Sequence, residues 1–165
     1  MPESKPTKND KALIGGFMNV AWGTSREEAM KIISLRDGVV FDAKESNQND
    51  IYFNGGTFSD FQVHMISLSF VHDRFYSGLV VVKPKPAVQD TWIDLCTGLT
   101  KKYGPEGWSD GVDAIWKFPY DHNANESITW MTAFDQGTVA IIYKNLLMEE
   151  EAENAHKESI TTKDL

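Results

Sequence analysis

The sequence predicts an α+β domain of two layers, in which an antiparallel β-sheet carries two helices on one face. Two stretches place apolar residues at helical spacing, and each is followed by several strand-like runs separated by turn compositions. Strands that follow one another, rather than alternating with helices, favour an antiparallel sheet over a parallel βαβ fold. The order helix, strands, helix, strands therefore predicts two tandem helix-plus-meander units.

The chain of 165 residues has 41% apolar and 12% aromatic residues, which is typical of a globular protein. A domain of this size buries about 68 to 70% of the surface that its unfolded chain exposes. We expect a flexible leader over residues 1–14 and one domain over 15–146, with units at about 17–83 and 87–145. Residues 147–165 form an acidic tail that is predicted to be either a marginal helix or disordered.

The first helix is expected to begin at Ser25, within the stretch "GGFMNVAWGTSREEAMKI" (15–32). Glycines before a helix can bind phosphate, but no preceding strand is evident, and Glu27 and Glu28 would repel an anion. Ser25 and Glu28 instead match a capping box. The stretch is therefore interpreted as a helix start that ends near Gly38. Its predicted apolar stripe is Ala29, Ile32, Ile33 and Leu35.

Strand-like runs follow this helix. They are "VVFDAKE" (39–45), "DIYF" (50–53), "FQVHMISLSFV" (61–71) and "FYSGLVVV" (75–82). Within the third run the apolar parity changes from Val63 and Met65 to Ile66 and Leu68. A period of two residues cannot absorb this change, so we expect a β-bulge or burial on both faces there.

A second helix is predicted over residues 88–103, before Gly104 and Pro105. Its inward stripe would be Trp92, Leu95, Cys96, Leu99 and Tyr103. Three further strands are predicted from "DAIWKFPY" (113–120), "SITWMTAF" (127–134) and "TVAIIYKN" (138–145).

Residues that support catalysis or metal binding do not form a recognisable pattern. Cys96 is the single cysteine, which excludes an internal disulfide, and we expect it to be a small buried hydrophobe. The four histidines, His64, His72, His122 and His156, are not paired at metal-ligand spacing. No Gly-x-Ser-x-Gly motif occurs. The sequence therefore predicts a protein that is not an enzyme and has no metal or cofactor.

The net charge of -8 is unevenly distributed, since residues 149–165 hold six acidic and two basic side chains. Negative charge repels phosphate backbones and anionic lipids, so nucleic acid and membrane surfaces are poor candidate partners. No apolar run reaches the ~18 residues that a membrane-spanning helix needs. The expected partner is another protein, and the expected state is a monomer or weak dimer without direct membrane insertion.

Four motifs along the chain form a recognisable set. They are "FMNVAWGTSREEAMKI" (17–32), "HDRFYSGLVVV" (72–82), "LTKKYGPE" (99–106) and "TVAIIYKN" (138–145). Together they resemble a broad group of uncharacterised bacterial envelope proteins and lipoproteins. That group has a Trp-Gly-x-Ser/Thr-x-x-Glu helix start and is similar to the β-lactamase-inhibitor-protein-like architecture of tandem helix-plus-meander units. The resemblance spans residues 17–145 and implies a non-enzymatic module whose concave sheet binds another protein.

The chain departs from that group in having no signal peptide or lipid-attachment cysteine, although its polar leader is similar to the tether of a processed lipoprotein. We expect an envelope location with the signal removed, ahead of a cytoplasmic one.

The favoured function is a non-catalytic binding or inhibitor-type module that uses the helix-free sheet face and the loop around Trp108. An exposed tryptophan beside a sheet is a plausible anchor for a partner. The candidate binding residues are Trp108, Gln62, His64, Tyr76, Lys117 and Thr129. One alternative is a carrier of an apolar small molecule, with a pocket lined by Trp116, Trp130 and Met131. A hydrolase is the least favoured alternative, and it would need His64 and His122 to meet a carboxylate.

Overall fold

The structure is a computed structural model, and the part of the chain that it describes is residues 14–85, 87–104, 108–109, 114–118, 125–133 and 137–163. Side chains are described over the same ranges except 108–109, 114–118, 130–133 and 159–163. The predicted leader therefore lies outside the described residues, apart from Ile14.

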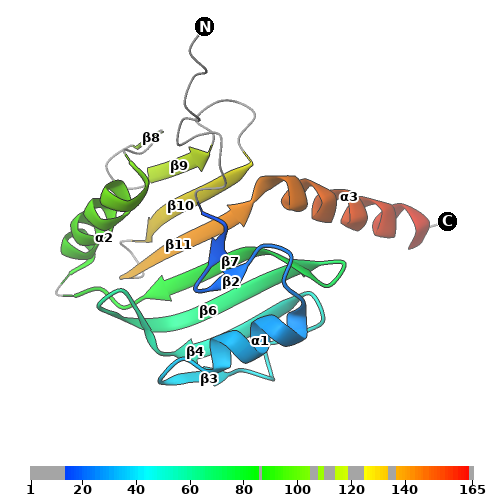
Figure 1. The fold of residues 1–165 in the computed structure, drawn as a ribbon, viewed down its shortest axis with the longest axis horizontal. Helices are drawn as coiled ribbons and strands as arrows, with labels where there is room; N and C mark the ends of the chain where they lie inside the picture. Colours follow the sequence, from blue (N-terminus) through cyan, green and yellow to red (C-terminus); the bar gives the residue numbers. More distant parts are fainter. Residues whose placement is uncertain are drawn as a thin grey trace, which may run out of the picture.

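The two predicted units build one antiparallel sheet, shown in Figure 1, and they meet at its centre. The first unit contributes β3 (Val39–Phe41), β4 (Asp50–Gly55), β6 (Phe61–Val71) and β7 (Arg74–Val82). The second contributes β8 (Trp108–Ser109), β9 (Ala114–Phe118), β10 (Glu126–Ala133) and β11 (Thr138–Asn145). The strand order is β3-β4-β6-β7-β11-β10-β9-β8, and the short β5 (Thr57–Phe58) pairs with β6. The last strand of each unit thus pairs with the last strand of the other.

Helices α1 (Arg26–Ser34) and α2 (Val88–Tyr103) lie on one face of this sheet (Figure 1). The bounds of α2 are those predicted from the sequence, residues 88–103. Ala29 and Ile33 of α1 are fully buried, and Leu95 and Leu99 of α2 join the same hydrophobic core. The two-layer α+β fold is thus the one that the periodicity predicted.

A small hairpin also lies on the helix-bearing face, and the sequence analysis missed it. It pairs β1 (Gly16–Phe17) with β2 (Val20–Ala21) in the stretch that was expected to lack a strand. Its two-residue turn places Met18 and Asn19 at φ values of 49° and 70°. Strands of two residues are too short to show alternation, so periodicity could not reveal them.

A buried carboxylate on β10 holds this hairpin in place. Glu126 is only 3% exposed. Its Oε1 accepts hydrogen bonds from the Gly15 amide at 2.9 Å and from Trp22 Nε1 at 2.8 Å. Its Oε2 accepts from the Ile14 amide at 3.3 Å. The carboxylate therefore ties residues 14–22, which contain the hairpin, to the second unit of the sheet.

Of the two alternatives expected in β6, the bulge is present. Val63 pairs with Val82 of β7, whereas Met65 pairs with its neighbour Val81, so His64 is the extra residue. The extra residue allows Val63 and Ile66 to be buried although they have opposite parity.

Two predicted details are wrong. Leu35 is 84% exposed, because α1 ends at Ser34 and Leu35 is its C-cap. The strand predicted over 39–45 ends at Phe41, because Asp42 starts a turn by accepting a hydrogen bond from the Glu45 amide at 3.1 Å. This bond, and one from Asn54, lower the pKa of Asp42.

The predicted cap of α1 is present, and it leads to a stability prediction. Ser25 Oγ accepts a hydrogen bond from the Glu28 amide at 3.3 Å. Ser25→Ala should therefore lower the free energy of unfolding by about 1 kcal/mol in urea titrations. Ser34→Ala, at the exposed other end of α1, is the matched control and should leave it nearly unchanged. Equal effects of the two substitutions would contradict the capping role.

Candidate functional site: the open face of the sheet

The sheet face opposite α1 and α2 is the candidate site. Because side chains alternate between the faces of a strand, the register defines which residues lie there. Ile66, Val80 and Ile141 pair in one row and are buried under the helices. The neighbours of opposite parity form the other face. We define the open face as Tyr52, Met65, Ser67, Leu79, Val81, Thr129, Ala140 and Ile142.

Aliphatic side chains occupy the centre of the open face. Leu79 pairs with Ile142, and Val81 pairs with Ala140, across the junction of the two units. All four are half-exposed, whereas Val80 and Ile141 between them are fully buried. A sheet face that stays in water is normally polar, and strands that are apolar on both sides are typical of sheets covered on both faces. The centre of the open face thus has the composition of a covered surface.

One end of the open face is polar. Asp50, Ser69, Ser77, Lys144 and Ser127 form a continuous row across five strands. Ser69 Oγ donates to Asp50 Oδ1 at 2.7 Å. The row therefore bounds the aliphatic centre on this side.

Helix α3 (Leu146–Lys163) crosses this polar end, so the expectation of a helix-free face is only partly right. The helix follows β11 directly, and Asn145 Oδ1 caps it by accepting from the Met148 amide at 3.1 Å. Lys144 Nζ donates to Glu149 Oε1 at 2.7 Å. Polar composition alone left this segment ambiguous between helix and disorder; the cap and the contacts with the sheet favour the helix.

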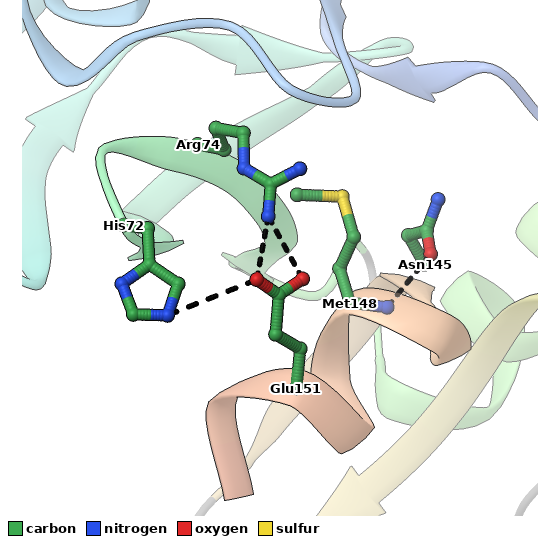
Figure 2. A network of polar contacts seen from close by, with 5 residues as sticks. All are labelled: His72, Arg74, Asn145, Met148 and Glu151. Atoms are coloured by element: carbon green, nitrogen blue, oxygen red, sulfur yellow. Dashed lines mark hydrogen bonds and ion pairs between the residues drawn. The ribbon is translucent and has the colours of Figure 1, made fainter. Parts of the chain in front are cut away.

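A second ion pair holds α3 against the turn between β6 and β7. Figure 2 shows both carboxylate oxygens of Glu151 facing the guanidinium of Arg74, at 2.6 and 2.8 Å. His72 Nε2 lies 3.7 Å from one of these oxygens (Figure 2). Both side chains of the Arg74–Glu151 pair are 40% exposed or more, so solvent screens their attraction. The pair therefore adds little to the stability and serves mainly to orient α3.

Tyr76 lies beneath α3 rather than on an exposed surface. It lines a pocket of about 350 Å³ together with Asn49, Asp50, Phe70, Val71, His72, Ala152, Ala155 and His156. Burial raises the pKa of Tyr76, and the negative charges of Asp50, Glu149 and Glu153 raise it further. The neutral form of the phenol is therefore favoured at the covered end of the face.

The other predicted site residues are spread over the sheet rather than gathered in one cluster. Thr129 is half-exposed and pairs with Ile142, so it belongs to the open face. Gln62 and His64 are exposed near the start of β6, at the opposite end from Tyr76. The backbone of Lys117 pairs with Ser127, and that of Trp108 pairs with Ile115. The side chains of Lys117 and Trp108 lie outside the described residues.

Sequence reasoning missed the aliphatic centre of the face. The runs "LVVV" (79–82) and "VAII" (139–142) are predicted strands, but the candidate binding residues include none of their members. The signal was the lack of alternation in both runs, which indicates burial on two faces. The two helices of the predicted second layer can cover only one face of the sheet, so the apolar residues of the other face remain uncovered.

Among the described residues, no group of three or more His, Cys, Asp or Glu side chains could hold a metal ion. No described helix is long and apolar enough to cross a membrane. Cys96 is half-buried on α2 rather than fully buried. His122, which the hydrolase hypothesis needs, lies outside the described residues, as do the side chains of Trp116, Trp130 and Met131.

Comparisons with protein-family models, with curated proteins and with solved structures find no match to this chain.

Proposed function

We propose that the protein is a non-catalytic binding module, and that its open face docks another protein. The observation that carries this proposal is the aliphatic centre formed by Leu79, Val81, Ala140 and Ile142, half-exposed at the junction of the two units. Contiguous apolar patches on a folded surface are typical of interaction sites. Covering them would remove apolar area from water at about 25 cal/mol per Å².

The charges around the open face indicate the chemistry of the partner. Glu153 and Glu150 on α3 are exposed, and Asp50 lies in the polar row beneath the helix. The whole chain carries a net charge of -8. A partner with an aliphatic ridge flanked by lysine or arginine would match both the centre and its acidic border, and opposite charges would accelerate the encounter.

Site-specific photo-crosslinking in cells tests this proposal. A photoreactive residue at position 79 or 142 should form one discrete adduct with a partner protein. The same residue at position 93 is the control, because Ile93 is 49% exposed but lies on α2, on the opposite face. With the partner purified, Ile142→Lys should weaken binding by about 2 kcal/mol, or roughly thirtyfold, and Ile93→Lys should not. An equal adduct yield at position 93, or unchanged affinity of Ile142→Lys, would refute the open-face assignment.

The carrier and hydrolase alternatives depend on Trp116, Trp130, Met131 and His122, and they stay predictions. The envelope location that the resemblance implies also stays a prediction.

A further inference from the structure

A groove lies on the helix-bearing face, between the β1–β2 hairpin and α2, and it is independent of the open face. Its volume is about 680 Å³, within the range of roughly 300 to 1,000 Å³ typical of small-molecule sites. The hairpin forms one wall and α2 the other. Aromatic side chains line it from four elements, namely Phe17, Phe58, Tyr103 and Tyr143.

The aromatic residues form one contiguous group. The rings of Phe17 and Tyr143 have centroids 5.1 Å apart, and those of Phe58 and Tyr143 are 6.4 Å apart. Burial raises the pKa of Tyr143, and the neighbouring Tyr103 raises it further, so this phenol stays neutral. The rings are tilted or edge-on to one another, and Phe58 is the most exposed of them, so the group offers an uncharged aromatic lining against which an apolar body can pack.

The wall formed by α2 is open at its middle and charged at its ends. Asp94, Gly98 and Lys102 all line the groove, and their spacing of four residues puts them on one face of the helix. A Cβ added at Gly98 would meet no atom within 4 Å. Glycine inside a helix costs about 0.5 to 1 kcal/mol relative to alanine, and packing does not require it here. Gly98 thus widens the groove between the two charges.

Two cations border the aromatic group. Lys102 lies next to Tyr103, with its Nζ 5.1 Å from the ring centroid. Arg36 also lines the groove, and its Nη2 donates to the carbonyl oxygen of Thr57, next to Phe58. Within the described residues, no carboxylate forms an ion pair with either cation. Asp94, the acid of this groove, lies two helical turns away from Lys102.

From these observations we infer that the groove binds an amphipathic small molecule with an apolar body and an anionic group. The body packs against the aromatic lining, mainly against Phe58, beside Gly98, and the anion pairs with the cations of the groove, Arg36 and Lys102. Charge complementarity carries the choice of an anion, because two cations, Arg36 and Lys102, line the groove with one acid, Asp94, in a protein of net charge -8. A neutral apolar molecule would use the same aromatic surface without the cations.

Fluorescence titrations with two probes test this inference. Anilinonaphthalene sulfonate carries an anionic group on an aromatic body, and N-phenylnaphthylamine is a similar neutral molecule. Lys102→Gln should weaken binding of the anionic probe about tenfold and leave the neutral probe unchanged. Lys101→Gln is the matched control, because Lys101 is exposed on the same helix and does not line the groove. Gly98→Leu, which fills the groove, should abolish binding of both probes.

Amide chemical shifts locate the bound probe in the folded protein. The amides of Phe17 and Gly98 should shift on titration, while those of Ser127 and Thr129 on the other face should not. Thermal unfolding of each variant establishes that the probes report on folded protein. The inference is overturned if neither probe saturates, if Gly98→Leu binds as the unsubstituted protein does, or if Lys101→Gln and Lys102→Gln weaken the anionic probe equally. Shifts confined to the open face would also overturn it.

Discussion

Replacing Glu126 by alanine should lower the free energy of unfolding by about 3 kcal/mol, the largest effect expected for a single polar side chain here. The carboxylate accepts from the Ile14 and Gly15 amides and from Trp22 Nε1. A hydrogen bond to a charged group contributes about 1.5 to 3 kcal/mol, but the three donors are only part-buried, so water can replace the lost acceptor and the three contributions do not add in full. Urea unfolding followed by circular dichroism measures the loss.

Two variants separate the hydrogen bonds of Glu126 from its charge and from surface effects. Glu126→Gln keeps the shape and one acceptor oxygen, so it should cost roughly 1 to 2 kcal/mol. Glu150→Ala removes an exposed carboxylate from α3 and should change the stability by about 0.5 kcal/mol or less. If Glu126→Ala lowered the free energy of unfolding no more than Glu150→Ala does, the hairpin would not depend on Glu126.

The second large effect is expected at Gly78, in the middle of β7. A Cβ at this position would overlap the ring of Phe17, which is only 3% exposed and packs on Tyr143. The ring lies between the sheet and the hairpin, so it cannot move without repacking the core. Overpacking of this kind costs about 1 to 3 kcal/mol, and Gly78→Ala should lower the free energy of unfolding by that amount.

Gly98→Ala is the matched comparison and should have the opposite sign. It adds the same methyl group inside α2, where no atom lies within 4 Å, and should raise the free energy of unfolding by about 0.5 to 1 kcal/mol. Adding Phe17→Leu to Gly78→Ala should recover part of the loss, because the two residues share one site. Destabilisation by both glycine substitutions, or additivity of the double variant, would contradict this account.

The sequence was most informative where the structure depends on neighbouring residues. The helix over 88–103, the strands over 61–71 and 138–145, and the Ser25 cap are present with the predicted residues. Helical periodicity, strand composition and turn residues act over a few positions and are visible in one chain. The change of parity within 61–71 is itself a local signal; it predicts either a bulge or burial on both faces, and the structure has the bulge, at His64.

The hairpin anchor and the covered end of the candidate site depend instead on contacts between distant residues. Gly15 and Glu126 are 111 residues apart, and Arg74 and Glu151 are 77 apart. Neither pair leaves a pattern in the sequence. The prediction that Tyr76 lies on an exposed face fails for the same reason. Helix α3 covers that end of the sheet through its contacts with distant strands, and the sequence does not reveal these contacts.

By itself, the sequence determined the α+β class, most helix and strand positions and the tandem order of the units, because each follows from the chemistry of adjacent residues. The tertiary structure alone decided that Leu79 and Ile142 share an uncovered face, that α3 covers only its polar end, and that the hairpin and α2 leave a groove between them. Burial is a property of the packed molecule, so a run that is apolar on both sides does not reveal which side remains exposed to solvent.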